Sequence, residues 1–100
     1  MEITEITPAQ ARIIPQGNIL ITNAGDLKEA LITLINRGFT EITIDFTHVQ
    51  TIDSSGLGKL LLGQKLLKER EGKLQIENVG SDYINKMFRM IHLDKIIEIH

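Results

Sequence analysis

The sequence of 100 residues contains no cysteine and no tryptophan, and only 4% of its residues are aromatic. Without cysteine, the chain can form no disulfide framework, no thiolate metal site and no cysteine nucleophile. With so few aromatic residues, its core must be built from leucine and isoleucine. The three histidines, His48, His92 and His100, are too widely spaced for a metal-ligand pattern. We therefore expect no metal and no cofactor.

Long apolar runs and an excess of one charge are also missing. The formal net charge is −2, from 11 basic and 13 acidic residues, and no basic stripe is visible that could neutralise a phosphate backbone. No apolar run approaches the roughly 20 residues that cross a bilayer. Residues Met1–Glu5 lack the basic start and apolar run of a signal peptide. We expect a soluble, cytoplasmic protein that binds neither nucleic acid nor membrane directly.

What is present is the balance of an ordinary globular protein, with 42% apolar and 24% charged residues. A chain of this length is expected to form one domain, over residues 1–100. A β-prone stretch at 3–6 predicts a first strand that ends at Thr7-Pro8. A second strand is expected within Ala11–Leu20. Pro15 interrupts it, so that strand would be bulged or lie at a sheet edge. A hairpin turning at Pro15–Asn18 is the alternative.

Helical periodicity follows. Residues 27–35 carry an apolar stripe, made of Leu27, Ala30, Leu31, Leu34 and Ile35. Asn23 with Asp26 can cap the start of this helix, and Gly38 suits its exit. Residues 41–46 then alternate between apolar and polar, which predicts a strand with one buried face.

A second helix is predicted from Ser55 to Arg70, with its apolar stripe formed by Leu57, Leu60, Leu61 and Leu67. Lys68 and Arg70 suit its C-terminus, and Gly72 is expected to stop it. Leu74 and Ile76 mark another strand. Ser81 can cap a third helix.

That third helix carries Ile84, Met87, Phe88 and Ile91, and residues 96–99 form a short final strand or turn. The order of elements predicts an α/β domain. We expect a mixed sheet of four to five strands packed with three to four helices.

The segment Thr51–Gly58 carries the most chemical information, because it follows the clearest strand and opens the most apolar helix. Backbone N–H groups there lack partners within the helix, and the helix dipole is positive. Asp53, Ser54 and Ser55 can cap those donors, or the donors can receive a phosphate on Ser55. A cap alone would explain only one of the three residues.

Two glycines inside the same helix call for an explanation of their own. Gly58 and Gly63 should each cost about 1 kcal/mol relative to alanine. They indicate a close backbone approach, either to the protein's own sheet or to a partner.

Enzymatic motifs are absent from this segment. Leu60 and Leu61 occupy positions where nucleotide-binding loops need serine or threonine and glycine. A serine-hydrolase elbow needs glycine at the positions held by Asp53 and Leu57. We therefore expect no enzyme and no catalytic residue.

The run Asp53-Ser54-Ser55-Gly56-Leu57-Gly58 after a strand resembles the signature of STAS domains, the family of bacterial anti-sigma factor antagonists. The similarity extends through residues 42–46, 72–78 and 93–99, so it covers nearly the whole chain. It implies a STAS domain over residues 1–100.

The resemblance also implies a mechanism. The unphosphorylated domain would bind an anti-sigma factor that is itself a serine kinase, and so release a sigma factor. The kinase would then phosphorylate Ser55, with Ser54 the second choice, and the complex would dissociate. Asp53, Gly56, Leu57 and Gly58 would contribute to partner binding, and the protein would be a monomer or weak dimer.

Two departures from the family pattern stand out. Many members carry an acidic residue where this chain has Leu20, and the family favours glycine near the end of the third helix, where this chain has His92. The first departure affects the phosphorylation site. The alternative function is therefore a STAS scaffold or subunit of a stress-signalling or lipid-transport complex without a phosphate switch.

Overall fold

The computed structural model of the chain describes all 100 residues and contains five strands, three α-helices and one 3-10 turn. In chain order they are β1 (Glu2–Glu5), β2 (Gln10–Ile14), α1 (Ala24–Asn36), β3 (Glu41–Asp45), α2 (Ser54–Lys68), β4 (Lys73–Glu77), α3 (Asp82–Met90), η1 (Leu93–Lys95) and β5 (Glu98–Ile99). The predicted α/β class and the predicted numbers of strands and helices are confirmed.

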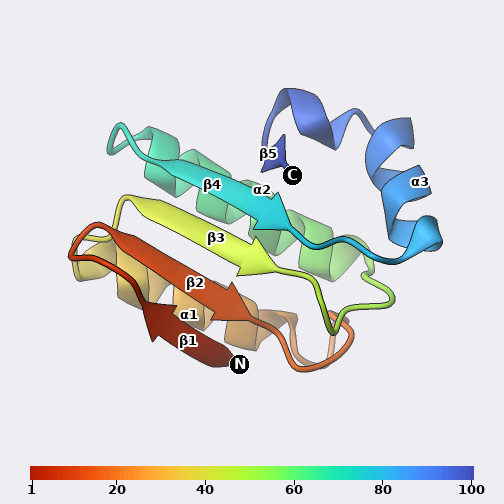
Figure 1. The fold of residues 1–100 in the computed structure, drawn as a ribbon, viewed down its shortest axis with the longest axis horizontal. Coiled ribbons are helices and arrows are strands. Elements are labelled where there is room, and N and C mark those ends of the chain that lie inside the picture. The colour runs from red at the N-terminus through yellow and green to blue at the C-terminus, as the bar shows by residue number, and fades with distance from the viewer.

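The strands form one mixed sheet in the order β1-β2-β3-β4-β5. β1 pairs antiparallel with β2, and the remaining neighbours pair parallel. Parallel crossovers are right-handed, so successive crossovers in the same direction put their helices on the same face of the sheet. In Figure 1, α1 and α2 accordingly lie side by side behind the sheet, whereas α3 lies beyond the end of β4.

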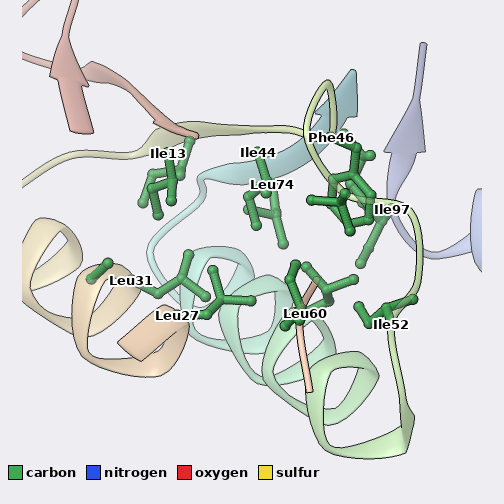
Figure 2. Close-up of a cluster of buried hydrophobic side chains, with 14 of the residues drawn as sticks. Ile13, Leu27, Leu31, Ile44, Phe46, Ile52, Leu60, Leu74 and Ile97 are labelled. Carbon is green, nitrogen blue, oxygen red and sulfur yellow. The ribbon is translucent and has the colours of Figure 1, made fainter. Parts of the chain in front are cut away.

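The core lies between the sheet and the α1–α2 layer. Figure 2 shows Ile13, Ile44 and Leu74 of three neighbouring strands directed toward Leu27 and Leu31 of α1 and Leu60 of α2. The cluster contains 23 buried apolar residues, and aromatic side chains contribute only phenylalanines to it. Phe46 and Phe88 pack edge to face with ring centroids 5.9 Å apart, which attaches α3 to the end of β3.

The prediction for the second strand was wrong in two respects. β2 ends at Ile14, before Pro15, and it lies inside the sheet between β1 and β3. Because the strand is already finished, the missing N–H of Pro15 removes no ladder hydrogen bond. The alternative hairpin at Pro15–Asn18 was also wrong. The chain turns between β1 and β2, where Ile6 donates its N–H to Gln10.

The ends of the first two helices differ in part from the sequence predictions. Asn23 occupies the N-cap position of α1 but makes no side-chain cap bond, because its Oδ1 accepts from the N–H of Leu20. Gly38 has φ +97°, as expected for a helix exit. α2 starts at Ser54 and ends at Lys68, one and two residues earlier than predicted. Arg70 donates to the carbonyl of Ile35 at the end of α1.

Glycines act in two ways near α2. A Cβ on Gly63 would lie 2.9 Å from Leu31 Cδ1, so this glycine lets α1 and α2 approach closely; a close approach was predicted, but to the sheet or a partner and not to α1. A Cβ on Gly72 would lie 2.3 Å from the carbonyl oxygen of Thr40. The positive φ after α2 belongs to Glu71, with φ 58°, so Gly72 serves close packing and not the helix stop.

The face of the sheet away from α1 and α2 carries an ion-pair cluster. Arg12 of β2 donates to Asp45 at the end of β3 (3.1 Å) and to Glu77 at the end of β4 (2.7 Å). The hydrogen bond with Glu77 raises the pKa of Arg12, against the opposing effect of its partial burial. Thr43, between Arg12 and Gln75 in register, is buried on this face. The cluster joins the middle of β2 to the ends of β3 and β4.

The third helix follows the prediction with one exception. Ser81 caps α3 by accepting the N–H of Ile84, and Ile84 and Phe88 are buried. Met87 packs against the core, but Ile91 follows the helix end and is exposed. The helix ends one residue before Ile91, so the predicted apolar stripe loses its last member.

Candidate functional site

The segment singled out by the sequence lies at the carboxyl ends of the parallel strands. The loop after β2 (residues 15–23) and the loop after β3 (residues 46–53) meet at this end of the sheet, and α2 begins where the second loop finishes (Figure 1). In open parallel sheets, binding sites concentrate at this edge. Ile19 and Ile52 form an isolated parallel bridge that joins the two loops.

Asp53 is the N-cap of α2. Its backbone is extended, and its Oδ1 accepts the N–H of Gly56 at 3.0 Å. The side-chain cap therefore comes from Asp53 and from neither serine. The aspartate therefore takes the N–H of Gly56, and that the other N–H groups at the helix start could receive a phosphate on Ser55 stays a prediction.

Asp53 also fixes the neighbouring loop. Its Oδ2 accepts the N–H of Ile21 at 2.8 Å, across 32 residues of sequence. The backbone N–H of Asp53 donates to the carbonyl of Ile19 at 3.1 Å. With both carboxylate oxygens engaged, Asp53 holds the start of α2 and the loop after β2 in one arrangement.

These hydrogen bonds lower the pKa of Asp53 below its ordinary value. The bond from the N–H of Gly56 is the largest cause, and the bond from Ile21 acts in the same direction, against a smaller opposing effect of burial. Asp53 is therefore ionised at neutral pH and places a negative charge beside Ser54 and Ser55.

Asn18 strengthens the same junction. Its Oδ1 accepts the N–H groups of Gln50 and Thr51, each at 3.0 Å. Asn23 donates its Nδ2 to the carbonyl of Asn18 at 2.7 Å. The two asparagines thus make the loop after β2 a rigid support for the start of α2.

The exposed side of α2 begins with Ser54. Ser54, Gly58 and Leu61 are all exposed and follow the spacing i, i+4, i+7, so they share one face of the helix. Ser55 is half-buried beside this face. Leu61 is 42% exposed, and Ile21, in the adjacent loop, is 76% exposed. The serines therefore stand among accessible apolar side chains. We call Ile21, Ser54, Ser55, Gly58 and Leu61 the α2 surface.

The two glycines of the motif have different surroundings. A Cβ on Gly56 would lie 2.6 Å from Ile52 and 2.8 Å from Ile19, so the protein's own interior requires glycine there. A Cβ on Gly58 would meet nothing within 4 Å, so the internal packing that could explain it is absent. Leu57 is half-buried and packs against the core. Of the predicted partner-binding residues, only Ser54 and Gly58 are exposed; Gly56 is buried and the others are half-buried.

The sequence analysis missed Asn18, Asn23 and Ile21 as parts of this site. The contacts of Asn18 and Ile21 join residues 32 or 33 positions apart, which no local periodicity records, and Asn23 bonds within its own loop to Asn18 and Leu20. The comparison with the family at Leu20, which lies in the same loop, was the available signal. Leu20 itself is half-buried, and its N–H donates to Asn23 Oδ1.

The structure contains no group of three or more histidine, aspartate or glutamate side chains that could hold a metal ion. No helix combines the length and the apolar character needed to span a membrane. What the site offers is a rigid pair of loops, two serine hydroxyls and accessible apolar side chains. Groups of these kinds are suited to binding another protein.

Comparison with known proteins identifies the family. Residues 4–98 match the family described as "Mlab, STAS domain". The chain is 33% identical over 100 residues to the anti-sigma-B factor antagonist of Listeria monocytogenes, covering 99% of the chain and 86% of that relative. It is 32% identical over 83 residues to the anti-sigma-B factor antagonist of Bacillus subtilis, covering 83% of the chain and 74% of that relative. The chain belongs to the STAS-domain family, among the anti-sigma factor antagonists.

Solved structures share the fold. The unphosphorylated form of the anti-sigma factor antagonist SpoIIAA superposes with a TM-score of 0.75 at 23% identity, covering 89% of this chain and 81% of that one. The phosphorylated form of the Bacillus cell fate determinant SpoIIAA gives a TM-score of 0.78 at 21% identity, with coverages of 99% and 89%. The predicted resemblance to STAS domains is confirmed.

Proposed function

We propose that this protein is a cytoplasmic anti-sigma factor antagonist which binds a serine-kinase anti-sigma factor and thereby releases a sigma factor. Phosphorylation of Ser55 by that kinase ends the binding. The observation that carries the proposal is the start of α2, where Asp53 provides the cap and the serine hydroxyls are left free of that task. The domain acts through recognition and carries out no reaction of its own.

The α2 surface suits a partner's active site. Ser55 stands one residue after the helix start, on a loop junction held by both carboxylate oxygens of Asp53. A rigid acceptor loses little conformational freedom on docking, which favours binding. Gly58 leaves the backbone of α2 uncovered one turn further on, and Ile21 and Leu61 supply apolar contacts. Exposed apolar groups of this kind are the usual anchors of an interface.

A phosphate on Ser55 would oppose the same contact. It adds about −1.5 to −2 charges at neutral pH. Asp53 is ionised nearby, so the added charge meets a like charge, with Lys59 one helical turn on as the available cation. In solution water can hydrate the phosphate, but in an interface it must be desolvated or paired. A loss of about 2.7 kcal/mol reduces the association constant a hundredfold.

Mass spectrometry tests the proposal directly. The protein is incubated with ATP and each serine-kinase anti-sigma factor of its source, and the phosphate is localised by fragmentation. We expect one phosphate on Ser55 and loss of the complex on gel filtration. Transfer to Ser54 alone would overturn the assignment of the acceptor. Binding without any transfer would overturn the switch.

The second candidate is a STAS scaffold or subunit without a phosphate switch. The observation that favours it is Leu20, a half-buried apolar residue where many family members carry an acid. In that case the start of α2 would be a docking surface alone. A stable large assembly on gel filtration, with Ser55→Glu binding as tightly as the wild type, would support this candidate.

A further inference from the structure

The first strand forms an open edge of the sheet. β1 pairs with β2 on one side and with nothing on the other, and all four of its residues are exposed. Such an edge presents unpaired N–H and C=O groups to any extended chain that can reach it. It shares no residue with the α2 surface.

The register shows which backbone groups are free. Ile6 donates its N–H to Gln10, so this pair is hydrogen-bonded, and antiparallel pairs alternate between bonded and non-bonded. Thr4 and Glu2 therefore bond inward to β2. The N–H and C=O groups of Ile3 and Glu5 point outward, toward the open edge.

A hollow of about 290 Å³ lies beside this edge, between β1 and α1. It is lined by Met1, Ile3, Asp26, Glu29, Ala30 and Thr33. Ile3 pairs with the buried Ile13 and so faces the helix side of the sheet, and it is 42% exposed.

Charge sets the chemistry of the hollow. Asp26 and Glu29 of α1 contribute two carboxylates to its wall, and neither carboxylate takes part in the ion pairs of the structure. Glu5, on the same face of β1, is paired with Arg37 at 3.0 Å. The hollow thus combines apolar lining at Ile3 with two carboxylates that form no ion pair with a lysine or arginine of the chain.

We propose that the β1 edge is a second docking site, which takes an extended segment of a partner protein by strand addition. The segment pairs with the outward N–H and C=O groups of Ile3 and Glu5. One face of the added strand carries the residue that lies opposite Ile3. On that face, apolar and basic residues alternate. The apolar residue fills the hollow, and the lysines or arginines pair with Asp26 and Glu29. Strand addition gains affinity from main-chain hydrogen bonds and specificity from alternate side chains.

A second copy of this chain fits the edge poorly. An antiparallel pair of β1 strands that uses the outward groups of Ile3 and Glu5 would set Glu5 of the other copy opposite Ile3, so it would bring a further carboxylate to the face that already carries Asp26 and Glu29. It would also bring no lysine or arginine to Asp26 and Glu29, since the residues of β1 are Glu2, Ile3, Thr4 and Glu5. The charges of the edge therefore favour a basic partner segment.

The test uses a short synthetic peptide with threonine on one face and alternating valine and lysine on the other, titrated into the full chain labelled with ¹⁵N. We expect chemical-shift changes centred on the amides of Ile3 and Glu5, and slower hydrogen exchange of both. A matched peptide with glutamate in place of lysine should not bind. Changes centred on Ile21 and Ser55, equal binding of the glutamate peptide, or no change at all would overturn the proposal.

Two variants separate the contributions. Ile3→Pro removes an outward N–H that the fold does not use, a position where an edge strand tolerates proline, and should abolish peptide binding. The pair Asp26→Asn and Glu29→Gln should weaken binding about threefold to tenfold, because each exposed ion pair contributes modestly.

The controls distinguish this site from the α2 surface. Glu69→Gln with Asp94→Asn removes two exposed charges elsewhere and should leave the peptide affinity unchanged. Ser55→Glu should also leave it unchanged, so a failed phosphorylation test would not affect this one. If the chain associated with itself in the absence of peptide, with chemical-shift changes at the amides of Ile3 and Glu5, the edge would bind a second copy of the chain. That result would overturn the proposal.

Discussion

The carboxylate of Asp53 accepts the backbone N–H of Ile21 from a loop 32 residues earlier in the chain, at 2.8 Å. The same carboxylate caps α2 through Gly56. One side chain therefore determines both where the helix starts and where the most exposed isoleucine of the chain stands. The stability of the site is consequently tied to the ionisation of a single group.

Asp53→Asn is expected to lower the free energy of unfolding at neutral pH, because the charged acceptor of the two N–H groups is lost. The folded-state pKa of Asp53 is depressed, so its contribution is fully present above the ordinary carboxyl pKa of about 4. That contribution fades as pH falls through the depressed value, because the unfolded chain takes up the proton first. Urea unfolding of both proteins from pH 7 to pH 3 should show their difference shrinking toward acid pH. A difference independent of pH would contradict this account.

Gly63 and Gly58 form a matched pair of substitutions in one helix. Gly58→Ala should raise the free energy of unfolding by about 0.5–1 kcal/mol, since the added methyl meets open space and alanine favours the helix. At Gly63 the methyl would collide with the buried Leu31, and overpacking costs roughly 1–3 kcal/mol. Because both variants gain the same helix propensity, they should differ by the overpacking cost of about 1–3 kcal/mol in chemical denaturation. Equal stabilisation by both would show that α1 and α2 are not in close contact at Gly63.

Gly58 and Gly63 also illustrate which features of the fold could be predicted from the sequence and which could not. Periodic apolar residues predicted α1, α2, β3 and β4, because burial against one layer imposes a regular spacing. The cost of glycine in a helix predicted a close approach at Gly63, although the neighbour is α1 and not the sheet. The same argument could not tell that Gly58 faces open space, since that depends on which side of α2 meets α1.

The rest of the site depends on contacts between loops. Pro15 was interpreted as a flaw within a strand, whereas it follows the strand's end. Asn18 and Asn23 form hydrogen bonds that no spacing rule records, and Asn23 looked like an ordinary helix cap. The segment Asp53–Gly58 was found because strand, cap and helix follow one another directly in the sequence. The sequence could not show that the loop after β2 lies beside this segment, because the two come together only in the folded structure.

His92 follows the C-terminal end of α3 and adopts a left-handed backbone conformation, with φ 55°. A glycine is the usual residue there, and the family favours it at this point of the sequence. His92→Gly should therefore raise the free energy of unfolding by about 0.5–1 kcal/mol, because glycine adopts this conformation without the steric penalty of a Cβ. Thermal denaturation measures the change. A decrease in stability would mean that the imidazole makes a contribution which outweighs the backbone strain.

Ile21→Ser tests the apolar part of the α2 surface. Ile21 is 76% exposed, so the substitution should leave the free energy of unfolding nearly unchanged. If the kinase covers this side chain, the loss of about 1.5–3 kcal/mol of buried apolar contact should weaken binding roughly tenfold to a hundredfold. Ile96→Ser, at an exposed isoleucine near η1, is the matched control and should bind like the wild type. Equal effects of the two substitutions would place the interface elsewhere. Calorimetric titration with the purified kinase gives both affinities.

Ser55→Glu and Ser55→Ala separate charge from the hydroxyl. Asp53 provides the cap of α2, so neither substitution should change the free energy of unfolding by more than about 0.5 kcal/mol. Ser55→Ala should bind the kinase within a few-fold of the wild type and remain bound in the presence of ATP, because no phosphate can be added. Ser55→Glu carries only one of the nearly two charges of a phosphate and should weaken binding at least tenfold. Surface plasmon resonance with and without ATP compares the three proteins. If Ser55→Glu bound as tightly as Ser55→Ala, a negative charge at this position would not be what ends the complex, and the phosphate switch would be wrong.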